Sequence, residues 1–140
     1  MVSKNMEKDI WKIMYDKARE VQNEREISPF IEAGGVAAAI LTKSGNIYVG
    51  VCIDTASTLG MCAERNAVFG AYCKGYRKED IIGLAIVADC SPIASPCGAC
   101  RQVLSELVDL EMPIFLANKE KVEKHTIGEL LPMVFIGESL

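Results

Sequence analysis

Apolar residues recur at steps of three and four along residues 9–24. They are Ile10, Trp11, Ile13, Met14, Ala18 and Val21, and charged side chains occupy the opposite face. This period is typical of an amphipathic helix whose apolar face packs on a core. Ser28-Pro29 and Gly34-Gly35 then interrupt the pattern, and both pairs predict breaks in regular structure.

The pattern then changes to one that is typical of β-strands. Residues 36–42 and 47–53 are short apolar runs, and the turn sequence Lys43-Ser44-Gly45-Asn46 separates them. We therefore expect a β-hairpin here. Residues 81–88 form a nearly continuous apolar run, which is typical of a strand that is covered on both faces.

Helices are expected between the strands that follow. Residues 62–72 carry small apolar side chains on one face, and residues 96–107 begin with a proline, which favours a helix start. Residues 113–117 and 122–126 predict two further short strands, and residues 127–131 a final helical turn. Strands that alternate with helices after an opening hairpin predict an α/β fold. We expect a three-layer α-β-α sandwich with a mixed five-stranded sheet.

Length and composition narrow the class of protein. A chain of 140 residues, half of them hydrophobic, is expected to form one domain over residues 1–140 with a substantial core. The net charge of −4 and the dispersed lysines and arginines argue against nucleic acid as a partner and favour a small free ligand. We find neither a secretory leader nor a membrane span. Six cysteines in such a chain indicate a reducing, cytoplasmic setting.

Three of the cysteines lie in two motifs that indicate a metal site. Glu64 stands two places after Cys62, and Cys97 and Cys100 form a C-x-x-C pair that Pro96 introduces. Three thiolates with an open fourth position for water are typical of a catalytic zinc, and a free carboxylate beside them can move protons of that water. Both motifs are expected at helix N-termini, where the helix dipole stabilises thiolates. Two helices that start side by side after a parallel pair of strands would bring the motifs together.

The remaining polar candidates have more ordinary interpretations. Three thiolates leave an excess of negative charge on a zinc site, so we expect Arg65 to donate hydrogen bonds to the sulfurs, with Arg101 as a weaker candidate. Cys73 is expected to be a small buried hydrophobic residue, and His125 a surface residue. Cys90 lies near the second motif and stays ambiguous.

Two alternatives for the cysteines explain less of the sequence. A structural zinc site with four thiolates would need a second C-x-x-C, which Cys62 lacks. A redox pair at Cys97 and Cys100 would leave Cys62 and Glu64 without a role.

The two motifs together resemble those of the short, homotetrameric cytidine deaminases and the related blasticidin-S deaminases. The matching segments are residues 61–67 (Met-Cys-Ala-Glu-Arg-Asn-Ala) and 95–103 (Ser-Pro-Cys-Gly-Ala-Cys-Arg-Gln-Val), with further similarity at 38–45 and 128–132. The resemblance implies hydrolytic deamination of cytidine or deoxycytidine to the uracil nucleoside and ammonia. It also implies one Zn²⁺ per subunit, a homotetramer with shared active sites, and a place in pyrimidine salvage.

The same resemblance assigns roles to residues around the metal. Glu64 would pass protons from the water to the ring nitrogen N3 and then to the departing amino group. The backbone N–H of Ala63 would hold the O2 atom of the base, and the Ser95 carbonyl would accept a hydrogen bond from its amino group. Phe135 would pack against the base.

The chain departs from the family pattern in the base pocket and in the sugar pocket. Cys52 and Asp54 stand where the family has Asn and Glu, whose side chains hold the ribose hydroxyls, and Gly34-Gly35 replaces a Phe-Pro pair. These changes imply a roomier pocket, so a bulkier cytosine nucleoside such as blasticidin S remains an alternative substrate. A non-catalytic, zinc-stabilised binding module is the alternative of another class. Editing of bases in RNA or DNA is disfavoured by the acidic composition, and by Cys62 where polynucleotide deaminases carry histidine.

Overall fold

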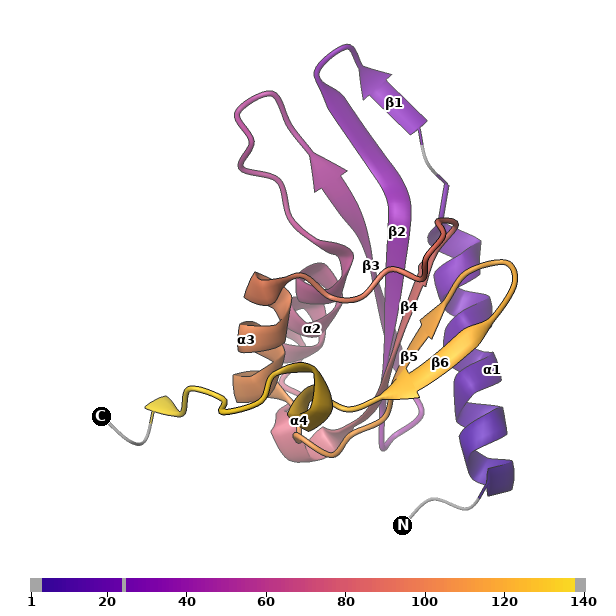
Figure 1. Ribbon diagram of the computed structural model, residues 1–140, viewed down its shortest axis with the longest axis vertical. Coiled ribbons are helices and arrows are strands. Elements are labelled where there is room, and N and C mark those ends of the chain that lie inside the picture. Colours follow the sequence, from indigo (N-terminus) through magenta and orange to yellow (C-terminus); the bar gives the residue numbers. More distant parts are fainter. Residues whose placement is uncertain (1–3, 24, 138–140) are drawn as a thin grey trace.

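A mixed sheet of six strands forms the middle layer of the computed structural model, which describes residues 4–23 and 25–137 (Figure 1). The strands in chain order are β1 (Arg25–Ser28), β2 (Ile31–Thr42), β3 (Ile47–Asp54), β4 (Ile81–Ala88), β5 (Ile114–Ala117) and β6 (Val122–His125). The helices are α1 (Lys4–Val21), α2 (Ala63–Cys73), α3 (Gly98–Leu107) and α4 (Ile127–Leu130), with a short 3-10 helix η1 (Lys78–Asp80). No helix of the described residues is both long and apolar enough to cross a membrane.

The long strand β2 organises the sheet. It pairs antiparallel with β3 on one side and with β4 on the other, and β1 pairs with its first residues. Strand β5 then runs parallel to β4, and β6 returns antiparallel to β5. The sheet is therefore mixed, as the sequence predicts.

Helices cover both faces of this sheet (Figure 1). On one face the buried side chains of α1, Met14 and Ala18, pack in a cluster with alternate residues of β2 and β4. On the other face α2, α3 and α4 contribute Ala67, Leu104 and Ile127 to a second core cluster. The opposite faces of each strand thus serve two cores, because successive side chains of a strand point to opposite sides. The predicted three-layer α-β-α sandwich is confirmed.

The prediction of five strands was wrong by one strand, and the reason lies at the glycine pair. Gly34-Gly35 was expected to end regular structure, but β2 runs through it from Ile31, with an irregular register between Ala33 and Ala37. Gly34 has φ +90°, and a Cβ there would lie 2.3 Å from the Asn23 carbonyl oxygen. The glycine pair therefore forms a bulge in β2, and the chain that follows α1 passes close to this bulge. The residues between α1 and β2 form the additional strand, β1.

The helices that carry the two cysteine motifs lie side by side, and both follow strands that run in the same direction, as predicted. Helix α2 follows β3 and α3 follows β4. These two strands run parallel to each other, but β2 lies between them, so they are not neighbours in the sheet. The Tyr72 hydroxyl of α2 donates to the Leu107 carbonyl of α3 at 2.7 Å and joins the helices at their C-terminal ends.

Helix α2 packs so closely on β3 that Gly50 must lack a side chain. A Cβ at Gly50 would lie 2.5 Å from the Ala63 carbonyl oxygen and 2.6 Å from the Ala67 nitrogen. Both contacts are with helix backbone, which cannot rotate away. We predict that Gly50→Ala lowers the free energy of unfolding by about 1–3 kcal/mol through overpacking, measured by urea denaturation.

Gly70 provides the matched control, because it lies within α2 and nothing would lie within 4 Å of an added Cβ. Gly70→Ala should raise the free energy of unfolding by about 0.5–1 kcal/mol, since alanine favours the helix. Equal effects of the two substitutions would contradict the close packing of α2 on β3.

Candidate functional site

Cys62 is held at the N-terminus of α2 by a backbone bridge to β3. The N–H of Met61 donates to the Ile53 carbonyl at 3.0 Å, and the N–H of Ile53 donates to the Met61 carbonyl at 2.9 Å. The loop can return this closely only because residue 60 is glycine, where a Cβ would lie 1.9 Å from the Ile53 oxygen. Cys62 is then the N-cap residue, with extended backbone, and the helix begins at Ala63.

The second motif opens α3 in the same way. Cys97 is the N-cap residue of this helix, and its Sγ accepts a hydrogen bond from the Cys100 N–H at 3.4 Å. Cys100 lies one turn further on and is fully buried. The prediction that both motifs stand at helix N-termini is confirmed.

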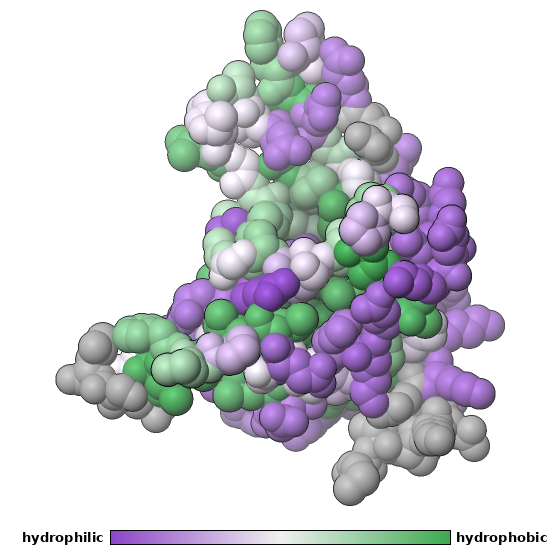
Figure 2. All heavy atoms as spheres, in the orientation of Figure 1, coloured by the Kyte–Doolittle hydropathy of each residue, from purple (hydrophilic) through white to green (hydrophobic). Residues whose placement is uncertain are grey.

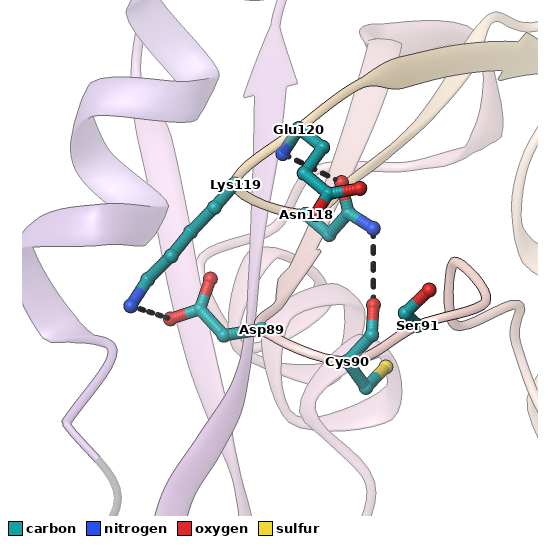
Figure 3. A pocket seen from close by; sticks show the side chains of 6 residues that line it. All are labelled: Asp89, Cys90, Ser91, Asn118, Lys119 and Glu120. Carbon is teal, nitrogen blue, oxygen red and sulfur yellow. Dashed lines mark hydrogen bonds and ion pairs between the residues drawn. The ribbon is translucent and has the colours of Figure 1, made fainter.

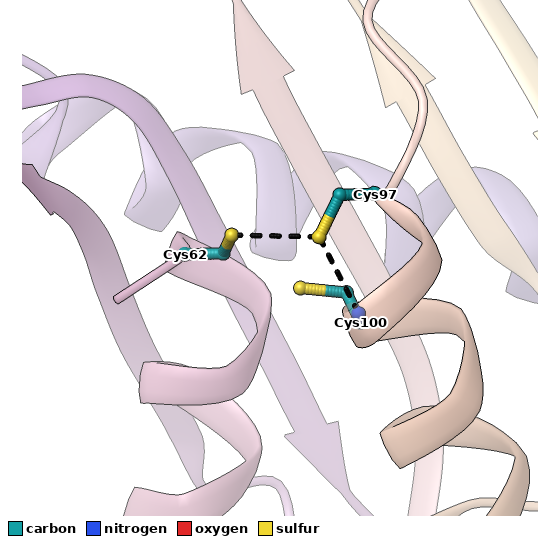
Figure 4. A group of neighbouring side chains, drawn as sticks. All are labelled: Cys62, Cys97 and Cys100. Carbon is teal, nitrogen blue, oxygen red and sulfur yellow. Dashed lines mark hydrogen bonds between the residues drawn. The ribbon is translucent and has the colours of Figure 1, made fainter. Parts of the chain in front are cut away.

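The three sulfurs converge between the two helix starts (Figure 4). The Sγ atoms of Cys62, Cys97 and Cys100 all lie within 4.8 Å of one another, and the Cys62–Cys97 separation is 3.6 Å. That separation is far longer than a disulfide bond of about 2.05 Å. It is close to the roughly 3.8 Å between two thiolates of a tetrahedral zinc with Zn–S bonds of about 2.3 Å. Among the described residues this group has three donors, so a tetrahedral metal held here would keep its fourth position for water or substrate.

The charges around the sulfurs also fit a cation. Burial raises the pKa of Cys100, and the nearby Glu64 carboxylate raises it further. Glu64 is only 4% exposed, and burial raises the pKa of its carboxyl, although its interaction with Cys100 opposes this. Burial also raises the pKa of Cys97, but hydrogen bonds from Cys100 and Ala99 outweigh it and leave that pKa lowered. The buried Cys100 thiol beside the buried Glu64 carboxyl, with the Cys62 and Cys97 sulfurs within 4.8 Å, is a donor set that a divalent cation would stabilise, and it fits zinc.

Arg65 points toward the sulfurs, as the sequence predicts. Its Nη2 donates to the Cys62 Sγ at 3.5 Å, and interactions with Cys62 and Cys100 raise the pKa of its guanidinium. Its Nε is buried without a hydrogen-bond partner among the described residues. Arg101 was the weaker candidate for this role, and its guanidinium instead bonds the Ser95 hydroxyl and the carbonyls of Pro96 and Leu130.

The residues that the resemblance assigned to the base and the sugar come from both cysteine motifs and from β3. Ala63 directly follows Cys62 and is buried, and Ser95 is exposed two residues before Cys97. A cavity of about 290 Å³ contains both Asp54 and Cys62, and its other lining residues are Thr55, Thr58, Gly60 and Met61. The Cys52 Sγ accepts a hydrogen bond from the Val36 N–H at 3.2 Å, so it ties the bulge of β2 to β3.

Phe135 is not brought to the cysteines within one chain. It is 53% exposed and lines a cavity of about 430 Å³ with Ser105 and Glu106, at the end of α3 opposite to Cys97. A role for this ring in a site would therefore require a second copy of the chain.

The other cysteines and the histidine lie outside the site. Cys73 was expected to be buried, but it is exposed, because it follows the buried positions of α2 by two residues and points away from the sheet. Cys90 is exposed at a separate cavity of about 170 Å³ beside Asp89 and residues 118–120 (Figure 3). His125 is partly exposed on β6 and pairs with Glu123 at 3.0 Å.

Sequence reasoning missed one residue that positions the site. The Asn66 side-chain amide donates to the Val51 carbonyl at 2.8 Å and fixes the first turn of α2 against β3. Asn66 lies one helical turn from Cys62, whose carbonyl accepts from the Asn66 N–H at 3.1 Å. An asparagine inside a predicted helix was the available signal, because asparagine there usually makes a specific hydrogen bond.

Comparison with known proteins identifies this arrangement. The family model described as the cytidine and deoxycytidylate deaminase zinc-binding region matches residues 12–116. A cytidine deaminase of Halalkalibacterium halodurans is 42% identical over 107 residues, which cover 75% of this chain and 80% of that protein. A blasticidin-S deaminase of Bacillus cereus is 32% identical over 108 residues, or 71% of this chain and 76% of that protein.

A solved structure agrees with the sequence matches. The crystal structure of cytidine deaminase from Burkholderia pseudomallei superposes with a TM-score of 0.78 at 33% identity. The superposition covers 89% of this chain and 98% of that one. The fold, the three convergent cysteines and the family match agree, and the chain belongs to the cytidine and deoxycytidylate deaminase family.

Proposed function

We propose that this protein hydrolyses the exocyclic amino group of a cytosine nucleoside, with cytidine or deoxycytidine as substrate. The observation that carries the proposal is the buried Glu64 carboxylate beside three thiols that leave a coordination position open. A bound zinc would supply a Lewis acid that lowers the pKa of a water near the substrate. The protein's own residues then have to hold the base and move the protons.

Glu64 is the residue that we assign to proton transfer. The reaction consumes one water and releases one ammonia, so one proton must reach N3 of the ring and another the departing amino group. A carboxyl whose pKa is raised by burial is better able to accept a proton and then return it during the reaction. The Ala63 N–H and the Ser95 carbonyl are assigned to the two polar edges of the base.

Arg65 is assigned to the electrostatic balance of the site. Its hydrogen bond to Cys62 withdraws charge from a thiolate that would otherwise reduce the acidity of a bound metal. The positive ends of α2 and α3 add to this effect, because Cys62 and Cys97 are the N-cap residues of those helices.

The alternatives are less well supported. A non-catalytic zinc-stabilised module has no use for a carboxylate that is 4% exposed and beside the thiols, since burial of a charge costs free energy. A bulkier substrate of the blasticidin-S type remains the second candidate, because Cys52 is engaged by the Val36 N–H and Asp54 faces an open cavity.

The setting of the enzyme is part of the same proposal. We take residues 1–140 as one domain that acts in the cytoplasm in pyrimidine salvage. The acidic composition supports a small-molecule substrate over a nucleic acid, because phosphate contacts require basic residues.

Replacement of Glu64 should separate chemistry from metal binding. Glu64→Gln keeps the size of the side chain but removes its ability to carry a proton. We expect kcat for deamination to fall by at least about 100-fold while zinc content stays at that of the unaltered protein. Deamination is followed by the loss of cytidine absorbance, and zinc by elemental analysis.

Two cysteine variants complete this experiment. Cys97→Ser should lose zinc and activity together, whereas Cys73→Ser should lose neither, because Cys73 is exposed outside the metal group. Loss of zinc from Glu64→Gln would instead make Glu64 a structural residue and contradict its assignment.

The sugar pocket should show an altered preference. Cys52 is a weak hydrogen-bonding group, so we expect kcat/KM for 2′-deoxycytidine or blasticidin S to exceed that for cytidine. The double variant Cys52→Asn, Asp54→Glu should shift this ratio toward cytidine by about tenfold. If the unaltered enzyme turns over cytidine as efficiently as it turns over 2′-deoxycytidine and blasticidin S, the pocket has not changed its specificity.

A homotetramer with shared active sites is the assembly that we propose. Apolar side chains are exposed at both ends of the molecule, where Figure 2 shows hydrophobic surface. They include Ile27, Phe30 and Leu59 at one end, and Met133, Phe135 and Ile136 at the other. Exposed groups of this kind are typical of interaction surfaces. In such an assembly the Phe135 ring would reach the site of a neighbouring copy.

Subunit mixing tests this assembly. Light scattering should give four times the chain mass of 15.3 kDa. Glu64→Gln and Phe135→Ala proteins, each weakly active, should regain activity when they are unfolded, mixed and refolded together. The gain arises because some sites then combine an intact Glu64 with an intact Phe135 from another copy. A monomeric mass, or no gain on mixing, would contradict shared sites.

A further inference from the structure

The segment that delivers Cys97 to the metal group has little regular structure of its own. Strand β4 ends at Ala88 and α3 begins at Gly98. Ile93 anchors the middle of the segment by packing against the core cluster. Every hydrogen bond that residues 91–96 make with the described part of the chain involves Arg101.

The position of Cys97 is fixed differently from the positions of the other two cysteines of the metal group. Cys62 directly follows the Met61–Ile53 bridge, which fixes it to β3. Cys100 is buried in the first turn of α3. Cys97 is exposed and stands where the irregular segment meets the helix, so its position depends on how that junction is held.

Arg101 holds the junction with three donors. Its Nε donates to the Pro96 carbonyl at 2.8 Å, and its Nη2 donates to the Ser95 hydroxyl at 3.0 Å. Its Nη1 donates to the Leu130 carbonyl at the end of α4, at 2.7 Å. The Pro96 carbonyl belongs to the peptide bond that joins Pro96 to Cys97. A planar guanidinium with three acceptors therefore fixes the orientation of the peptide directly before a metal-group cysteine.

We propose that Arg101 is a positioning residue of the metal centre, which holds Cys97 in place by tying the Ser95 hydroxyl and the Pro96 carbonyl to α3 and α4. This proposal rests on zinc binding at the three cysteines, as in the proposed function, but not on which substrate is turned over. It differs from the role of Arg65, because Arg65 bonds a sulfur while Arg101 bonds the backbone that carries one. A competing explanation is that Arg101 merely joins α3 to α4.

Zinc release distinguishes the two explanations. The zinc-loaded protein is mixed with an excess of a chromophoric chelator in the absence of substrate, and the rate of zinc transfer is recorded. We expect Arg101→Met, which removes all three donors, to release zinc about ten times faster or more. The rate of zinc release from Arg101→Lys should lie between the rates of Arg101→Met and the unaltered protein. An ammonium can replace only some of the three hydrogen bonds that the guanidinium donates.

Arg77 is the matched control. Its Nη1 also donates to backbone carbonyls, those of Tyr72 at 3.2 Å and Tyr76 at 2.7 Å, but at the far end of α2. Arg77→Met should leave the rate of zinc release unchanged, even if it lowers the midpoint of thermal unfolding. Cobalt substitution adds a spectroscopic readout, and Arg101→Met should alter the thiolate-to-cobalt absorption bands while Arg77→Met should not.

The results that would overturn this proposal can be told apart from those that would overturn the proposed function. Zinc release from Arg101→Met at the unaltered rate, with normal cobalt spectra, would overturn it and make Arg101 a link between helices. If Arg101→Met fails to fold, Arg101→Lys decides, and an unaltered rate there overturns the proposal equally. Absence of zinc from the unaltered protein would overturn both this proposal and the metal centre, whereas lack of deamination with normal zinc would count against the proposed function alone.

Discussion

The meeting of two helix N-termini is the constraint on which the rest of this structure depends. Cys62 and Cys97 each cap a helix, so their sulfurs lie in the positive field of α2 and α3, where thiolates are favoured. Strand β2 lies between β3 and β4, the strands that lead to the two helices, and so sets the spacing of α2 and α3. Gly50 and Gly60 then let α2 and its preceding loop approach β3 closely. The chemistry of the site thus depends on backbone spacing set elsewhere.

Much of the architecture could be predicted from the sequence because its signals are local. The period of apolar residues predicted α1, the hairpin of β2 and β3, and the buried strand β4, each close to its observed bounds, except that α1 and β2 both start earlier than predicted. The start of β2 could not be predicted, because glycine breaks a strand in most contexts and forms a bulge in a few. Which context applies at Gly34 depends on Asn23, which lies near it only in the folded chain.

Some features of the candidate site follow from residues that are close together in the sequence, and others depend on residues that are far apart in it. Cys62, Cys97, Cys100 and Arg65 lie within two short motifs, so their chemistry could be predicted from the sequence alone. The exposure of Cys73 could not be predicted, because burial depends on which face of a helix meets the sheet. The link from Arg101 to Leu130 spans 29 residues, and no periodicity in the sequence indicates it.

The pairing of β2 with β4 has a consequence for the order of folding. Ala38 pairs with Ile86, far along the chain, and the cysteine motifs cannot meet until such pairs have formed. Contacts between distant residues form slowly, because the intervening chain must first close a loop. A nascent chain therefore exposes its thiols before it can bind a metal. Binding of a metal by all three cysteines would then require that β2 and β4 have already paired.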